Sequence, residues 1–348
     1  MADGAVKVGS PVGAPPAAPP AGSARVREPR GARARTWAGR LGVLLFLVAM
    51  IAAFSAAMPD RFATSGNFRA MIESQAVLLL LAIAATVPLR AGDFDLSIAS
   101  MMTASAAMGA TILQDGGSLL VVLLLAVVMG FAVGLINGFF VVRIGVDSFV
   151  TTLGSLTALT GVTFAISNSE VIFGFDGGVV SLARTELLGL PMSVWYGWIL
   201  VLVAWYVYER TPLGRYLLFV GGGRDVARLA GLKVDRIRMG AFVASSTIAA
   251  LAGVVLIGDL GAFDPSVGPS YLLQPFAAAF LGAAALYVGR FNAFGTLIGL
   301  YLLIVGITGL QLLGAETWVS DVFNGVALIL AVTVARVIGG RGGQAARA

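Results

Sequence analysis

The chain has 348 residues, of which 58% are hydrophobic and only 12% are charged, and its formal net charge is +5. With a mean hydropathy of +0.92, it carries more apolar surface than a soluble fold could hide, so lipid is expected to be its solvent. The absence of cysteine and histidine excludes disulfides, thiolate chemistry, imidazole bases and the commonest transition-metal ligands. We therefore expect no catalytic residue, no metal site and no cofactor in this chain.

The N-terminal stretch, residues 1–36, is dominated by Pro, Ala, Gly and Arg. Such a composition cannot build a packed core, and it predicts a disordered cytoplasmic tail. The first long apolar stretch follows from Ala38 to Met58. Its length and its distance from the initiator predict an anchoring helix rather than a cleavable signal peptide.

About ten apolar stretches have the length of a membrane span. Their unbroken hydrophobic runs lack the alternation of barrel strands, so the sequence predicts an all-α polytopic membrane protein. We expect a transmembrane domain at 37–338, with a long cytoplasmic loop at 209–238, and a second cytoplasmic tail at 339–348. The predicted spans are residues 38–58, 70–89, 96–113, 119–142, 149–167, 192–208, 239–258, 271–287, 292–313 and 316–336.

The positions of the basic residues predict the orientation of these spans. With the N-terminus in the cytoplasm, all of the 23 Lys and Arg residues except Arg61, Arg69 and Arg184 fall on the cytoplasmic side. This asymmetry predicts that both termini are cytoplasmic and that the number of spans is even. Because membrane insertion explains the basic clusters, we expect no nucleic-acid partner.

Two stripes of glycine predict where helices approach closely. Gly130, Gly134 and Gly138 recur every fourth residue, as do Gly295 and Gly299. In lipid, small residues at this spacing allow helix backbones to come together. These stripes indicate architecture and not chemistry.

A short pattern occurs twice and predicts an inverted internal repeat. Residues 94–98 read Phe-Asp-Leu-Ser-Ile, and residues 263–267 read Phe-Asp-Pro-Ser-Val, with five predicted crossings between them. An odd number of crossings inverts the second copy, which is a recurrent plan of transporters whose solute path lies between the halves. A weaker match joins residues 129–134 to residues 294–299. Chance similarity between apolar segments is the alternative.

Polar residues near the two copies are candidates for lining a solute path, although each also has a simpler interpretation. Asp93 and Asp95 precede the third span and could cap it, and capping is the simpler interpretation of Asp264 and Ser266 as well. Asn137 could join helices or face the path. The predicted path residues are Phe94, Asp95, Ser97, Asn137, Asp264 and Ser266.

The loop at 209–238 interrupts a chain whose other inner loops are short, which favours docking of a partner. A helix start is predicted at 211–216, a break at 221–223, and a short helix at 224–229 that ends at Gly231. A basic loop that contacts lipid phosphates is the alternative. The predicted docking residues are Gly222, Arg224, Asp225, Ala227, Arg228, Leu229 and Gly231, with Val226 adding apolar surface.

The glycine run within this loop does not predict nucleotide binding. It lacks the GxxxxGK[ST] spacing of a phosphate-binding loop, and neither of the two lysines, Lys7 and Lys233, is placed for that role. We therefore expect that this chain is not an enzyme and that any ATP hydrolysis occurs in a separate polypeptide.

Three stretches resemble a known family: AGDFDLSIAS at 91–100, RTPLGRYLLFVGGGRDVARLAGLKV at 210–234, and AALAGVVLIGDLGAFDPSVG at 249–268. Over about residues 40–336 the chain resembles the permease subunits of bacterial ABC importers of the ribose/xylose type. The resemblance implies a multi-pass protein of the bacterial plasma membrane, a homodimer of permeases, a docked ABC ATPase and an extracytoplasmic solute-binding protein. It departs from the family pattern at 283–292, which leaves the particular sugar open.

Two other functions compete with this interpretation. A stand-alone secondary transporter would share the inverted repeat, but it normally needs an ion site at membrane depth, and few acidic residues besides Glu73 lie deep in a predicted span. An intramembrane protease is less compatible with the sequence, because no Ser-His pair can form and Gly92-Asp93 offers a single carboxylate where two must face each other.

Overall fold

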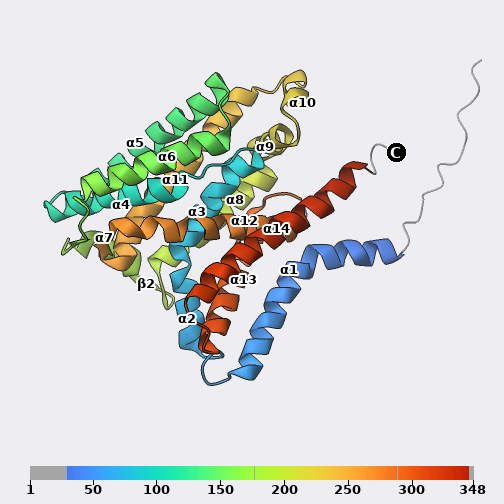
Figure 1. Cartoon of the computed structure of the whole chain (residues 1–348), viewed down its shortest axis with the longest axis horizontal. Helices are drawn as coiled ribbons and strands as arrows, with labels where there is room; N and C mark the ends of the chain where they lie inside the picture. Colours follow the sequence, from blue (N-terminus) through green and yellow to red (C-terminus); the bar gives the residue numbers. More distant parts are fainter. Residues whose placement is uncertain (1–29, 176, 288, 345–348) are drawn as a thin grey trace, which may run out of the picture.

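The computed structural model describes residues 30–175, 177–287 and 289–344, and this part of the chain is mostly helical (Figure 1). A π-helix, η1 (Phe139–Ile144), continues α5, and a 3-10 helix, η2 (Pro265–Tyr271), precedes α12. The α-helices are α1 (Arg30–Ala57), α2 (Ser65–Ser74), α3 (Ala76–Arg90), α4 (Ile98–Gln114), α5 (Leu119–Gly138), α6 (Ser148–Ile166), α7 (Gly177–Arg184), α8 (Met192–Arg210), α9 (Pro212–Gly222), α10 (Arg224–Leu229), α11 (Val234–Leu260), α12 (Leu273–Ala284), α13 (Ala293–Leu312) and α14 (Trp318–Gln344).

Several of the described helices can cross a membrane. Four are long and apolar enough by themselves, namely α5 continued by η1, α6, α11 and α13. The pair α2 and α3 makes a fifth candidate, bent by 44° at the break between them. Shorter apolar helices lie at Leu41–Ala57, Ile98–Gln114 and Trp318–Leu330. Helices cover the greater part of each predicted span, although residues 70–89 are divided between α2 and α3 and α12 covers only part of 271–287. The chain is thus a polytopic helical membrane protein.

The fold differs from a purely helical one at two short strand pairs. Strand β1 (Ile172–Phe173) pairs antiparallel with β4 (Ala262–Phe263), and β2 (Glu186–Leu187) forms a hairpin with β3 (Leu190–Pro191). These segments connect helices, and pairing satisfies their backbone N–H and C=O groups where no helix can. The β2–β3 hairpin and α7 lie towards the opposite end of the molecule from α9 and α10 (Figure 1).

Helices extend into both of the segments predicted as tails. Helix α1 begins at Arg30, and α14 continues to Gln344, so residues 30–36 and 339–344 are helical rather than tail. Alanine and arginine in residues 30–36 are good helix formers and extend α1 beyond its apolar stretch. Residues 339–344 contain four glycines, and helix propensity does not explain their helical form. The remainder of the two predicted tails lies outside the described residues.

The predicted glycine stripes are confirmed as places of close helix packing. A Cβ at Gly134 of α5 would lie 2.5 Å from the Cα of Val243 in α11, and a Cβ at Gly299 of α13 would lie 2.5 Å from the carbonyl oxygen of Ala278 in α12. Backbone atoms cannot yield as a flexible side chain can, so only glycine fits at these points. Gly130, Gly138 and Gly295 make similarly close contacts.

The helices contact one another in two matching groups. Helix α4 packs against α5, α6 and α11, and helix α12 packs in the same way against α13, α14 and α3. Helices α3 and α11, which precede α4 and α12 in the chain, lie against each other. Two copies of a four-helix unit would produce this pattern of contacts.

Candidate translocation path and docking segment

The turn that follows α3 presents its polar side chains to the protein interior. Gly92 adopts a positive φ of 80°, which lets the chain turn sharply before α4 begins. Asp95 then accepts hydrogen bonds from the backbone N–H and the hydroxyl of Ser97, at 3.2 and 2.5 Å. This is a side-chain turn just before α4, whose N-cap residue is Ser97. No side chain of a described residue caps the first N–H groups of α4, so the capping predicted for Asp95 is not observed.

Ser97 also belongs to a hydrogen-bonded chain that joins three helices. The amide of Asn137 in α5 donates to the Ser97 hydroxyl at 2.9 Å, and its oxygen accepts from Ser155 of α6 at 2.5 Å. The side chains of Asp95, Ser97 and Asn137 are fully buried in this conformation. Of the two interpretations of Asn137, the structure therefore favours the one in which it holds helices together.

The second copy of the pattern repeats the local geometry in a more open place. Asp264 accepts from the backbone N–H of Ser266 at 2.8 Å and from its hydroxyl at 2.7 Å, and it caps η2. The capping interpretation of Asp264 is thus confirmed, but the helix it caps is the 3-10 helix, and α12 begins only at Leu273. Asp264 and Ser266 are exposed, and so in part is Phe94 of the first copy.

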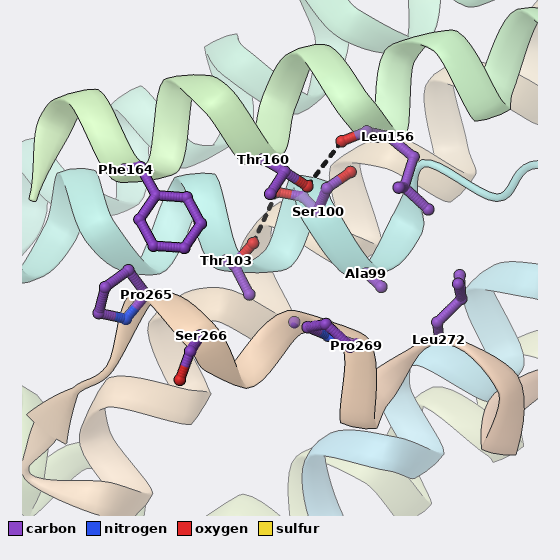
Figure 2. A pocket seen from close by; sticks show the side chains of 11 residues that line it. Ala99, Ser100, Thr103, Leu156, Thr160, Phe164, Pro265, Ser266, Pro269 and Leu272 are labelled. Atoms are coloured by element: carbon purple, nitrogen blue, oxygen red, sulfur yellow. Dashed lines mark hydrogen bonds between the residues drawn. The ribbon is translucent and has the colours of Figure 1, made fainter. Parts of the chain in front are cut away.

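A cavity of about 240 Å³ lies between these elements. Figure 2 shows residues of α4 and α6 along one side and residues of η2 along the other. Ser100, Thr103, Thr160 and Ser266 contribute hydroxyl groups to a lining that is otherwise apolar and, within the described part of the chain, contains no charged side chain. The hydroxyls of Thr103 and Thr160 donate to carbonyls of their own helices at 3.1 and 2.8 Å. Their oxygens can still accept a hydrogen bond from a solute.

The docking segment, which we define as residues 221–231, has the predicted form. Helix α10 is flanked by the glycine run and by Gly231, whose φ is +80°. Leu229 is 90% exposed and Val226 is 64% exposed, but Ala227 is fully buried against its own chain. Ala227 was predicted as docking surface, yet a helix lying on the protein must turn one face inward, and its smallest side chain occupies that face.

The other predicted docking residues differ in what they contact. Gly222, Asp225 and Gly231 are exposed. Arg228 is also exposed, and it donates to the Asp235 carboxylate at 3.1 Å. Arg224 turns instead towards the chain itself and donates to Asp93 at 2.8 Å.

Asp93 is a residue whose partner the sequence did not predict. Its carboxylate accepts two hydrogen bonds of 2.7 Å from Arg238 as well as the one from Arg224. Asp93 is thus neither a helix cap nor a path-lining group here, because all its contacts lie on the docking side. Arg224 and Arg238 stand out as basic residues in an otherwise apolar chain, but nothing in the sequence indicates that they pair with Asp93.

A second cavity, of about 710 Å³, lies beside α9 and the glycine run. Arg90, Arg215 and Arg290 contribute to its lining, and none of the acidic residues that the structure describes does. Arg90 is engaged internally, since it donates to the carbonyl of Phe291 at 2.7 Å. The surface next to α10 is therefore basic and partly hollow, which suits an acidic partner.

Comparison with known proteins identifies a matching family and several related proteins. A family model described as "Branched-chain amino acid transport system / permease component" matches residues 69–332. The ribose import permease protein RbsC of Escherichia coli K12 is 31% identical over 306 residues, covering 86% of this chain and 94% of that protein. The D-allose transport system permease protein AlsC of the same strain is 28% identical over 300 residues, covering 86% and 92%.

A third relative, the L-arabinose ABC transporter permease protein AraH of Azospirillum brasilense, is 28% identical over 306 residues, covering 87% of this chain and 90% of that protein. No solved structure matches the chain significantly.

Proposed function

The chain belongs to the family of branched-chain amino acid transport system permease components, and from that membership we propose that it forms the membrane path of an ATP-driven sugar importer. Its solute would be a monosaccharide or a related polyol. As a permease component, the chain serves transport rather than catalysis.

The lining of the hydroxyl-lined cavity is the observation from which we infer the class of solute. An amino acid enters as a zwitterion, and burying its two charges without partners is costly. The described residues of α4, α6 and η2 give the cavity hydroxyl groups and apolar walls but no charged side chain. An uncharged solute rich in hydroxyl groups matches this lining, and relatives named for ribose, allose and arabinose support it.

The six residues predicted for the path divide by exposure. Phe94, Asp264 and Ser266 are accessible and remain candidates for lining it. Asp95, Ser97 and Asn137 are buried, and we assign them to holding α4, α5 and α6 in place around it. The cavity adds the half-buried Thr160 to the candidates, and it is also lined by Ser100 and Thr103, which are buried in this conformation.

The exposed side of α10 supports docking of a separate ATPase. Val226 and Leu229 offer apolar surface on a helix too short to be stable by itself, and the neighbouring cavity is basic. A solute-binding protein would contact the opposite end of the molecule, near α7 and the β2–β3 hairpin, and a second permease copy would complete a homodimer in the bacterial plasma membrane. With both termini cytoplasmic, ten helical segments would cross the bilayer in two inverted repeats.

Transport by proteoliposomes tests the proposal. The permease, the ATPase and the binding protein are reconstituted together, and uptake of labelled ribose, allose, arabinose and leucine is measured with and without internal ATP. We expect ATP-dependent uptake of at least one sugar and none of leucine. Sugar uptake without ATP would identify a secondary transporter, and leucine uptake would contradict the argument from the cavity.

Thiol labelling tests the path separately, because the chain has no native cysteine. A cysteine at Ser266 or at Thr160 should react with a water-soluble thiol reagent in at least one transport state. A cysteine at Ser246, which is fully buried in α11, is the matched control and should resist. Resistance of both path positions in every state would refute the assignment.

A further inference from the structure

Asp93 lies in the loop 91–97 and faces the starts of α10 and α11, and its side chain is only 1% exposed. Arg238, near the start of α11, donates from Nε to Oδ2 and from Nη2 to Oδ1, at 2.7 Å each. Arg224, the first residue of α10, donates from Nη2 to Oδ1 at 2.8 Å and to the carbonyl of Gly92 at 3.1 Å. One carboxylate therefore holds the starts of two successive helices.

The two arginines are held with different strength. Arg238 is 5% exposed, so its guanidinium cannot leave the carboxylate without leaving a buried charge unpaired. The side chain of Arg224 is 42% exposed, and water and salt can replace its partner at little cost. The contact between Arg238 and Asp93 is therefore a fixed anchor, whereas the contact between Arg224 and Asp93 can break and re-form.

The residue after Asp93 faces the path side of the same turn. The N–H of Phe94 donates to the Ser148 hydroxyl of α6 at 3.1 Å. Its ring lies against Phe276 and Phe280 of α12, with ring centroids 6.4 and 6.2 Å apart. A displacement of Asp93 is thus passed within one residue to α6, which lines the hydroxyl-lined cavity, and to α12, which directly follows η2 on the other side of that cavity.

We propose that Asp93 is a positioning residue that transmits movement of α10 to the loop 91–97, with Arg224 as the contact that is released and restored. The inference rests on the proposed docking of an ATPase at α10. When the ATPase shifts α10, Arg224 moves relative to Asp93, while Arg238 keeps the buried carboxylate neutralised. The loop can then change position without exposing an unpaired charge to the membrane interior.

Arg224→Gln in the reconstituted complex tests the proposal. Contrary to its prediction as a docking residue, Arg224 donates to Asp93 and to the Gly92 carbonyl of its own chain and is not part of the exposed apolar side of α10. We therefore expect the variant to keep ATPase association and the basal rate of ATP hydrolysis. Stimulation of hydrolysis by solute-loaded binding protein should fall severalfold, and solute transported per ATP should fall with it. Arg236→Gln is the matched control, since Arg236 is exposed near the start of α11 and makes no ion pair with a described residue.

Two results would overturn the inference. Full stimulation of Arg224→Gln would show that the contact with Asp93 transmits nothing, and loss of ATPase association would make Arg224 a docking contact instead. A wild-type complex that fails to bind any ATPase would contradict the proposed function, which is a different failure.

A double-mutant cycle adds an independent measurement. If Arg224 acts through Asp93, then Arg224→Gln should reduce stimulation no further in an Asp93→Asn background. Additive losses would contradict the proposal. Because Asp93→Asn leaves Arg238 without its charge partner, the thermal stability of the variant is measured first. Should that variant not fold, Asp93→Asn is combined with Arg238→Gln, so that no buried charge is left unpaired, and this background takes its place in the cycle.

Discussion

Truncation of Leu229 is the most direct perturbation of the proposed docking surface. The side chain is 90% exposed in the isolated chain, so nearly all its apolar area is available for burial by a partner. Burying a leucine contributes about 1.5–3 kcal/mol. We expect Leu229→Ala to lose about 2 kcal/mol of the binding free energy, which raises the Kd for the ATPase roughly thirtyfold. Titration of labelled ATPase against the permease in lipid nanodiscs measures that Kd.

Leu188 provides a matched control for this experiment. It is 85% exposed on the β2–β3 hairpin, which lies towards the other end of the molecule from α10. Leu188→Ala removes the same atoms from a similarly exposed site and should leave the Kd for the ATPase unchanged. An unchanged Kd in Leu229→Ala, or an equal loss in both variants, would refute docking at α10.

Three further outcomes are expected. Gly134→Val should lower the thermal unfolding temperature of the purified protein, because its Cβ would lie 2.5 Å from the α11 backbone and overpacking costs about 1–3 kcal/mol; Gly240→Val, with open space around it, should not. Asn137→Ala should also destabilise, by about 1–3 kcal/mol, because the half-buried Ser155 hydroxyl loses its acceptor and the buried Ser97 hydroxyl loses one of its two partners. Reporter fusions at Gly222 and at the C-terminus should both report the cytoplasm, and opposite sides would contradict an even number of spans.

Features that depend on neighbouring residues could be predicted from the sequence. Span positions follow from apolar runs, and the end of α10 follows from Gly231, whose positive φ a residue with a side chain rarely adopts. The break between α2 and α3 at Gln75 was not predicted, although the polar residues Glu73, Ser74 and Gln75 interrupt the apolar run there. The helical start at residues 30–36 was missed because helix propensity there is not accompanied by hydrophobicity, and the glycine-rich residues 339–344 offer neither signal.

The candidate site was predictable only in part, because its geometry depends on distant segments. Asp93 and Arg238 are 145 residues apart in the chain, and no local pattern pairs them. The hydroxyl groups of Ser100 and Thr160 form one cavity only because α4 and α6 lie side by side. Likewise, the burial of Ala227 depends on which face of α10 meets the rest of the protein.

The two copies of the Asp-x-Ser pattern show how one local geometry serves different purposes. In both, an aspartate accepts from the N–H and the hydroxyl of the serine two residues later. The first copy is buried and its serine is also bonded to Asn137, so in a medium where polar groups find no replacement it can move only together with α5 and α6. The second copy is exposed and leads into a 3-10 helix with weaker internal hydrogen bonding, so it can move by itself at lower cost. The same local geometry is thus coupled to neighbouring helices at one copy and left independent at the other.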